Sequence, residues 1–403
     1  MTVFDNALLW DGSGAPPSRA ALCVVEERIA EDGACAGAVH VDLGGAFVVP
    51  GLIDTHVHVE REDDLPLYTR LGVTTVLAMV ETLAEAQRLE AASRRHPDWP
   101  EITSAAPIFT ARSGWWDEST PRDAEVDRFP GSAAEAEAAV DRAAALGARR
   151  LKVMLDDMRW CRDPEPRLAR MKPEVFAALA DAARRHGLPL LVHAVRAVDV
   201  AEAVAGGTAL LAHGPLESPL PAEVESAIAA RGIAISPTLG VYEFLADLPS
   251  FLDRALGDPR LRALVPEATI ARYRSAEYAA SYAASYPNQR EVARLLPELR
   301  AALRRLAAAG APIVLGTDMW AFPGTGVHLE LEAMATAGLD SRNVLLGATA
   351  RAATALGLAD RGVLVAGRRA DFVVLEPGAD PLRDVRELRA IAAVYRGGRR
   401  VHP

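Results

Sequence analysis

The chain has 403 residues, of which 50% are hydrophobic, enough for one large domain or two ordinary ones with a substantial core. Its net charge of −10 and the lack of a dense Lys/Arg block exclude the basic surface typical of proteins that bind nucleic acid or anionic membranes. The sequence shows no leader pattern and no run of about 18 apolar residues, so we expect a cytoplasmic protein. We expect a small molecule as its partner, and a homo-oligomer is compatible with the sequence.

Both ends of the chain differ from its middle. Residues 1–49 and 362–403 alternate apolar and polar positions and are interrupted by turns such as DG and GG. Neither end is long enough for a stable sheet domain alone, so we predict that they pair into one small composite β-sandwich. The three cysteines, Cys23, Cys35 and Cys161, form no C-x-x-C pair, and we expect them to be reduced, without a disulfide or a cysteine metal site.

From Val48 onward, short β-rich apolar runs alternate with alanine-rich helical stretches, which is typical of βα units around a parallel sheet. There are eight such runs: VVPGLIDTHVH, VTTVLAMV, ITSAAPIFT, RRLKVML, LPLLVHAV, TALLAHG, GIAISPTL and APIVLGTD. Eight repeats predict an α/β fold with a closed (β/α)8 TIM barrel over residues 50–361.

The connection between runs seven and eight, residues 240–310, is much longer than a usual βα connection. It predicts a helical insertion in which Tyr278, Tyr282 and Tyr286 share one helical face. That face either packs on the core or belongs to a lid over the barrel mouth.

Residues with metal-binding side chains recur at the carboxyl ends of the runs, where barrel active sites lie. His56 and His58 are alternate residues of one strand and therefore point to the same face. The others are Lys152, His193, His213 and Asp318. Each alone has an ordinary alternative, a core histidine or a helix cap, but their coincidence at strand ends indicates a site for zinc or a similar divalent ion.

So many ligands exceed the needs of one tetrahedral site and suit two adjacent metal ions. A buried ammonium beside two cations is strongly disfavoured. If the amine of Lys152 were carboxylated by CO2, the resulting anion could bridge both ions.

These motifs resemble the amidohydrolase superfamily of metal-dependent hydrolases, through VVPGLIDTHVH, LKVM, VHA, AHG, GTD and GVLVAGRRADFVVLE. SPTLGVYE and HLELEAMATAGL are similar to the branch of imidazolonepropionase-like amidohydrolases and Xaa-Pro dipeptidases. The resemblance implies that one zinc is held by His56, His58 and Asp318 and the other by His193 and His213, with carboxylated Lys152 and a hydroxide bridging them.

The resemblance also implies a mechanism. The bridging hydroxide attacks an amide carbonyl, and Asp318 passes a proton to the leaving nitrogen. Tyr242 stands where this branch has a donor to the oxyanion, although a packing tyrosine is equally compatible. Single-metal deaminases of the superfamily have a Glu three residues after the fifth-strand histidine, where this chain has Arg196. We therefore expect hydrolysis of a C–N bond, peptide bonds included, rather than deamination.

The substrate is indicated by residues after the strands. TARSGWWDE replaces the Gly- and His-rich loop of dipeptidase-like members, which puts a dipeptide substrate in doubt. The tryptophans that follow strands three, four and eight predict an aromatic or bulky apolar substrate: Trp115, Trp116, Trp160 and Trp320.

Arg112 and Arg159 are either carboxylate-binding or ordinary surface residues, and His328 either faces the substrate region or simply begins a helix. Three alternatives to a C–N hydrolase stay open. They are an ester or carbamate hydrolase on the same site, a lyase or isomerase on this scaffold, and a catalytically silent binding protein.

Overall fold

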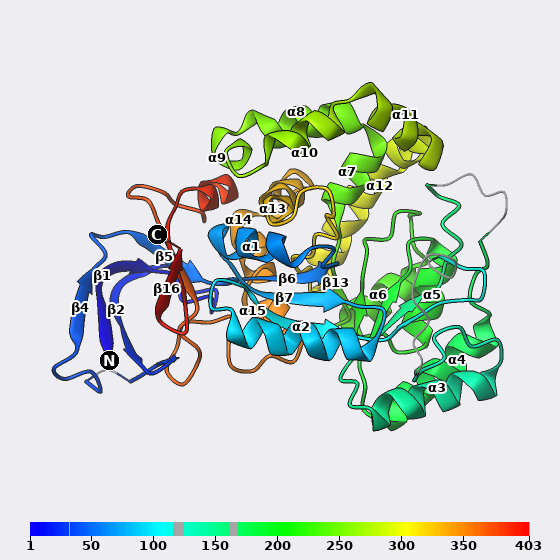
Figure 1. Cartoon of the computed structure of the whole chain (residues 1–403), viewed down its shortest axis with the longest axis horizontal. Helices are drawn as coiled ribbons and strands as arrows, with labels where there is room; N and C mark the ends of the chain where they lie inside the picture. The colour runs from blue at the N-terminus through cyan, green and yellow to red at the C-terminus, as the bar shows by residue number, and fades with distance from the viewer. Residues whose placement is uncertain (32, 116–124, 162–167, 403) are drawn as a thin grey trace.

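The structure is a computed structural model that describes residues 1–31, 33–115, 125–161 and 168–402. A β-domain that holds both chain ends lies beside a larger part built of parallel strands and helices (Figure 1). Strands β6 and β7 run away from the β-domain, so their carboxyl ends lie on the side of the barrel remote from it (Figure 1).

Seven of the eight predicted runs contain strands, and they form two parallel sheets. One sheet has the order β6-β7-β8 and the other the order β13-β12-β11-β10-β9. Their bounds are β6 Leu52–Val57, β7 Val73–Met79, β8 Glu101–Ala105, β9 Ile108–Phe109, β10 Leu151–Met154, β11 Leu190–His193, β12 Leu210–Leu211 and β13 Ala234–Ile235. Run three is divided between β8 and β9 at Pro107, which has no N–H to donate to a neighbouring strand.

The eighth run, residues 311–318, closes the barrel through hydrogen bonds on both of its sides. Ile313 forms a parallel bridge with Ile235 of β13. On the other side, the Thr55 amide donates to the Leu315 carbonyl at 2.9 Å, and the Asp318 amide donates to the His56 carbonyl at 2.8 Å. The predicted (β/α)8 barrel is confirmed.

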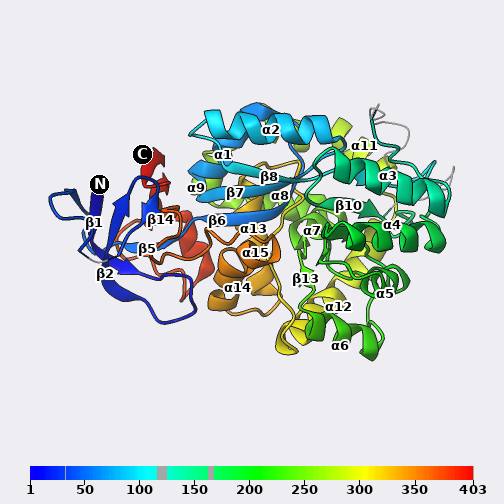
Figure 2. The ribbon, with the colours of Figure 1, turned by 90° about the horizontal axis from the view of Figure 1, so that it is seen from below.

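Helices cover the outside of the strands, as α2, α3 and α4 show in Figure 2. Several begin where the sequence offers a cap: Thr82 accepts the Glu85 amide before α2, and Ser132 accepts the Glu135 amide before α3. The bounds are α1 Leu65–Arg70, α2 Leu83–Arg95, α3 Ala133–Ala145, α4 Pro173–Arg185, α5 Ala197–Ala205, α6 Ala222–Arg231, α13 Thr325–Thr336, α14 Ser341–Gly347 and α15 Ala350–Ala355, with 3-10 turns at Glu62–Asp64 and Val385–Arg389.

Residues 239–308 form six further helices, and α8 to α11 lie together above the barrel in Figure 1. Tyr282 is buried, and its hydroxyl donates to the Phe244 carbonyl, whereas Tyr286 lines the central cavity. The tyrosine face therefore packs on the core and also reaches the cavity, while its role as a lid stays a prediction. The bounds are α7 Leu239–Ala246, α8 Leu248–Gly257, α9 Pro259–Arg262, α10 Glu267–Tyr273, α11 Ala276–Ser285 and α12 Gln289–Ala308.

The composite β-domain is one hydrogen-bonded sheet of strands from both chain ends, in the order β16-β15-β14-β5-β1-β2-β3 with β4 beside β1. Its core includes the rings of Phe4, Phe372 and Tyr395. The chain enters the barrel at Gly51, where a Cβ would lie 2.2 Å from the Thr74 hydroxyl. The bounds are β1 Thr2–Leu9, β2 Ser18–Val25, β3 Arg28–Ile29, β4 Val39–Asp42, β5 Phe47–Pro50, β14 Phe372–Leu375, β15 Ile391–Arg396 and β16 Arg399–His402.

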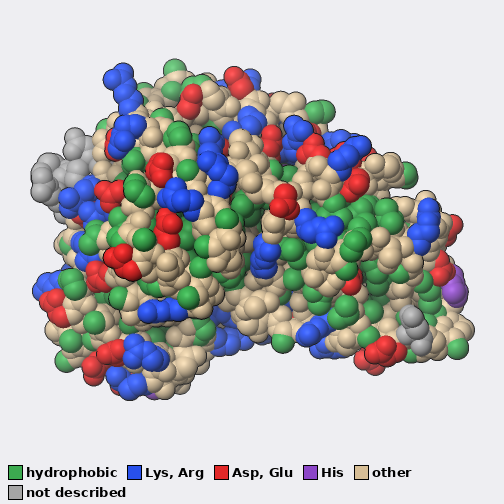
Figure 3. All heavy atoms as spheres, turned by 180° about the vertical axis from the view of Figure 1, so that it is seen from behind, with side chains coloured by type: hydrophobic (Ala, Val, Ile, Leu, Met, Phe, Trp, Pro, Cys, Tyr) green, Lys and Arg blue, Asp and Glu red, His purple; other side chains and the backbone are tan. Residues whose placement is uncertain are grey.

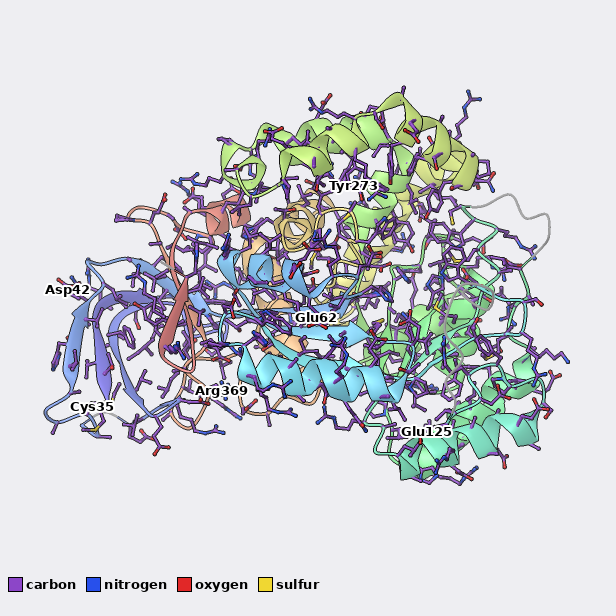
Figure 4. All side chains as sticks on the ribbon, viewed as in Figure 1. Cys35, Asp42, Glu62, Glu125, Tyr273 and Arg369 are labelled. Carbon is purple, nitrogen blue, oxygen red and sulfur yellow. A yellow bond between two sulfur atoms is a disulfide. The ribbon has the colours of Figure 1, made fainter. Side chains whose placement is uncertain are left out.

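The expectation of three reduced cysteines is wrong. Cys23 and Cys35 form a disulfide at the edge of the β-domain (Figure 4). Cys161 is buried and forms no disulfide. The loop after β3 folds back on β2 and brings the two Cα atoms within 5.8 Å, a contact that the spacing of cysteines along the chain does not reveal.

The surface and the helices give two further findings. Acidic and basic side chains are interspersed over the face seen in Figure 3. Among the residues whose structure is described, no helix combines the length and the apolar character needed to cross a bilayer. The folded part thus offers neither a membrane span nor, on that face, an extended area of one charge.

Candidate metal centre

His56 and His213 are each held by a hydrogen bond from one ring nitrogen, and the other ring nitrogen points into the barrel. The Nδ1 atom of His56, at the end of β6, lies 2.7 Å from the Ala212 carbonyl. A carbonyl can only accept, so this nitrogen carries the proton and Nε2 has its lone pair exposed. The Nδ1 atom of His213, after β12, is hydrogen-bonded to the Thr238 hydroxyl at 2.8 Å.

Asp318 is the point toward which the inner nitrogens turn. Its Oδ1 atom lies 3.6 Å from Nε2 of His56 and 3.5 Å from Nε2 of His58, and its Oδ2 atom lies 3.9 Å from Nε2 of His213. These distances are longer than direct hydrogen bonds and leave room for an ion between the ligands. The Asp318 backbone has φ of +51°, a strained conformation for a non-glycine residue and one often found at functional sites.

Lys152 and His193 complete the group from the neighbouring strands β10 and β11. Both side chains are buried and line the same cavity. The rings of His193 and His213 lie 4.4 Å apart, edge to face. Nε2 of His193 is 3.1 Å from a carboxylate oxygen of Asp156, but within the described residues it makes no hydrogen bond of acceptable geometry.

The electrostatics keep these imidazoles neutral. Burial lowers the pKa of His58 to about 3 and the pKa values of His56 and His213 well below their ordinary range. Burial also lowers the pKa of Lys152 to about 7 and raises the pKa of Asp318 to about 7, although each opposes the shift of the other by its charge. Neutral imidazoles with inward lone pairs are the form that metals bind, so this donor set fits divalent ions.

A cavity of about 440 Å³ opens above these ligands. Its walls are largely apolar or aromatic and include Trp115, Trp160 and Trp320, three of the four tryptophans that the sequence indicated. Trp116 lies outside the described residues. A pocket of this size and character suits a small molecule with an apolar part.

Three other residues predicted for the site do not line the described cavity: Arg112, His328 and Tyr242. The Arg112 guanidinium is exposed, and its Nε donates to the Phe129 carbonyl at 2.8 Å. His328 is buried in α13, with Nε2 hydrogen-bonded to the Leu71 carbonyl at 3.0 Å. The Tyr242 hydroxyl donates to the Gly214 carbonyl at 3.0 Å, while its ring lies beside Trp160.

The comparison with known families decides the class of protein, because residues 47–401 match the Amidohydrolase family. The chain belongs to the amidohydrolase family. It is thus an enzyme of a hydrolase family, and the resemblance carried by its histidine, lysine and aspartate motifs is confirmed.

Individual relatives are distant or match only in part. An imidazolonepropionase from Deinococcus deserti is 39% identical over 97 residues, covering 20% of this chain and 24% of that protein, so the match spans about a quarter of its length. The structure of a Xaa-Pro dipeptidase with bound methionine has a TM-score of 0.76 at 20% identity and covers both chains fully. Molinate hydrolase has a TM-score of 0.71 at 18% identity, over 99% of this chain and 94% of its own. The two structures establish a shared fold.

Sequence reasoning missed two carboxylates of this amidohydrolase. Asp54 accepts the Thr317 hydroxyl at 2.7 Å and the Thr317 amide at 3.0 Å, which ties β6 to the residue before Asp318. Asp156 accepts the indole N–H of Trp160 at 2.9 Å with one oxygen and faces His193 with the other. Asp54 stands inside the motif VVPGLIDTHVH, and Asp156 directly follows the run RRLKVML, so proximity to these motifs was the available signal.

Proposed function

We propose that this amidohydrolase hydrolyses a C–N bond of a small molecule with an aromatic or bulky apolar part, and that it uses two zinc ions. The observation that carries the proposal is the convergence of four imidazoles, one carboxylate and one lysine at the bottom of a single apolar cavity. The interpretation as a silent binding protein is disfavoured because this complete set of ligands has no purpose without a metal.

In this proposal His56, His58 and Asp318 hold one cation, and His193 and His213 hold the other. Lys152, if carboxylated on its amine, would supply an anionic ligand to both. The lowered pKa of this buried lysine supports the neutral amine that the reaction with CO2 requires. When bound, the cations polarise the scissile carbonyl and lower the pKa of an attacking water.

The protein side chains then orient the substrate and move its protons. Asp318 takes a proton from the water and returns it to the leaving nitrogen, a role in keeping with its position among the inward-facing histidine nitrogens. Tyr242 donates to the developing oxyanion by exchanging its present acceptor, the Gly214 carbonyl. The tryptophans exclude bulk water and stack on the apolar part of the substrate.

The names of the structural relatives, a Xaa-Pro dipeptidase and a molinate hydrolase, are in keeping with hydrolysis. Arg196 supports hydrolysis over deamination, because it occupies the position where deaminases of the superfamily carry a glutamate. Its Nε donates a hydrogen bond of 2.8 Å to Asp199. An ester or carbamate would be attacked at the same carbonyl position and remains the alternative.

The test combines metal analysis with a substrate screen. Purified protein loaded with zinc should hold about two ions per chain and hydrolyse members of a panel of aryl amides, N-acyl amino acids, dipeptides and lactams. Matched aryl esters and carbamates in the same panel separate the alternative. Less than one ion per chain after loading, or turnover of esters alone, would contradict the proposal.

A further inference from the structure

In the described part of the cavity, the charged side chains other than the proposed metal ligands are all acidic. Apart from the proposed metal ligands, the charged residues that line its described part are Glu60, Glu81 and Glu85. Glu60 follows β6, and Glu81 and Glu85 follow β7, so the three occupy one sector of the barrel mouth. No ion pair joins them to a lysine or arginine in the part of the chain that the structure describes.

The arginines nearby in sequence bind other acidic or carbonyl groups. Arg112 pairs with Glu135 at 3.2 Å and with the Phe129 carbonyl, and Arg159 pairs with Asp157. Within the described lining, Lys152 is the only basic side chain other than histidine, and it belongs to the proposed bridge. The described cavity lining therefore offers no arginine to bind a substrate carboxylate, which favours the alternative that Arg112 and Arg159 are ordinary surface residues.

Aromatic rings stand on both sides of this acidic sector. Around the barrel, residues 311–318 precede β6 and the β8/β9 pair follows β7. Trp320 follows the first of these strands and Trp115 the last, and both line the cavity. Indole faces beside carboxylates form a site for an organic cation, because both groups attract positive charge.

A third metal ion does not explain the glutamates. Among the described residues, only His56, His58 and Asp318 form a group of three whose ligand atoms lie within 4.8 Å of one another. The glutamate oxygens are thus too dispersed for one inorganic ion but suit a larger cation with several N–H donors. Burial raises the pKa of Glu81. The nearby charge of Glu85 also raises it, whereas the charge of Arg128 lowers it, so Glu81 already lies among charges of both signs.

We infer that the substrate carries an ammonium or guanidinium group on the part distant from the scissile bond, bound by Glu81 and Glu85 between Trp115 and Trp320. The inference rests on the proposed hydrolytic function. It adds a cationic end to the aromatic or bulky apolar body of the proposed substrate.

The kinetic test uses three acetanilides that differ only at the para position, where they carry aminomethyl, ethyl or carboxylate. For the zinc-loaded enzyme we expect kcat/KM to be about tenfold higher for the aminomethyl than for the ethyl compound, and lowest for the carboxylate. The E81Q/E85Q variant should lose the preference for the cation, and a zinc content close to that of the native enzyme would show that it is folded.

The matched control is Glu62→Gln. Glu62 pairs with exposed Arg88 and does not line the described cavity, although it lies only two residues from Glu60 (Figure 4). This variant should keep the cation preference. Equal kcat/KM for the aminomethyl and ethyl compounds, a faster carboxylate compound, or a preference unchanged in E81Q/E85Q would overturn the inference while hydrolysis stands.

A binding measurement distinguishes failure of the cation site from failure of the proposed hydrolysis. Calorimetric titration of the zinc-loaded protein with benzylammonium and with benzyl alcohol should show tighter binding of the cation, by about tenfold, and E81Q/E85Q should remove the difference. If none of the acetanilides is cleaved but this binding pattern is found, the cation site stands and hydrolysis of these amides fails. If benzylammonium binds no better than benzyl alcohol, the inference fails whatever the activity.

Discussion

The cavity has two regions of different construction, which we call the floor and the rim. The floor consists of the proposed metal ligands, which are His56, His58, Lys152, His193, His213 and Asp318. The rim consists of the aromatic and acidic side chains above them, which are Trp115, Trp160, Trp320, Glu60, Glu81 and Glu85. Floor residues lie in a strand, within two residues after one, or, for Asp318, at the end of the eighth run, and they are buried or nearly so. Rim residues lie in loops or at the start of a helix.

The floor and the rim differ in how their side chains are held in place. On the floor, backbone groups fix the side chains, as the Ala212 carbonyl fixes His56. On the rim, side chains pack on other side chains, as the ring of Trp320 does against Phe244 at 5.7 Å. The floor is therefore expected to determine the reaction and the rim the substrate, so that variants of the floor change kcat and metal content while variants of the rim change KM.

The largest effect is expected from Asp318→Asn on the floor. The amide keeps the size of the side chain but cannot carry the proton, and it is a weaker metal ligand, so kcat should fall about 10³-fold. Steady-state kinetics with parallel zinc analysis measure both losses. Asp98→Asn, an exposed residue outside the described cavity lining, is the control and should leave both unchanged. A kcat within a few-fold of the native value would contradict the assignment of Asp318 to proton transfer.

The next effect is expected from Lys152→Ala, because it removes the proposed bridge. The bound zinc should fall from about two ions to about one per chain, and short carboxylic acids such as acetate should restore part of the activity by replacing the bridging anion. The chain has only one other lysine, Lys172, which is exposed before α4 and provides the control Lys172→Ala. Full zinc content and activity in Lys152→Ala would exclude the bridge.

Asp156→Asn tests the residue that joins floor and rim. Asp156 contacts His193 below and the Trp160 indole above, so its substitution should weaken zinc binding by about tenfold and raise KM at the same time. Zinc affinity by chelator competition and KM are the two measurements. The neighbouring Asp157 pairs with Arg159 and Arg196, and Asp157→Asn should change neither. A change in only one of the two quantities would show that Asp156 does not couple the regions.

The floor could be predicted because its residues stand at the carboxyl ends of the predicted strands. Alternation fixes the direction of His56 and His58, and the carboxyl ends of parallel strands meet at one end of a barrel. Lys152 carried an additional signal, since it is one of two lysines in a chain with 44 basic residues. Closure of the barrel by residues 311–318 also followed from the count of eight runs, although short hydrogen-bonded contacts replace a regular strand there.

The rim could be predicted only in part, because contacts distant in sequence decide its orientations. Arg112 and Trp115 are three residues apart, yet Arg112 turns to the Phe129 carbonyl and Trp115 lines the cavity. His328 is held by the Leu71 carbonyl, 257 residues away. Glu81 and Glu85 escaped notice because they are two among 54 acidic residues and neither stands in a recognisable motif. The Cys23–Cys35 disulfide was missed because the spacing of the cysteines does not reveal that the loop after β3 folds back on β2.

The smallest effect is expected from Trp320→Ala, and it is the sharpest test of the division between floor and rim. Trp320 lies two residues after Asp318, so a purely local view would predict that its loss disturbs the metal site. Because its ring packs on Phe244 and the cavity rather than on the ligands, we expect KM to rise about fivefold with kcat and zinc content nearly unchanged. Trp320→Phe, which keeps an aromatic face, should recover most of the native KM. A fall in kcat or zinc content in Trp320→Ala would mean that the rim supports the floor and that the two regions are not separable.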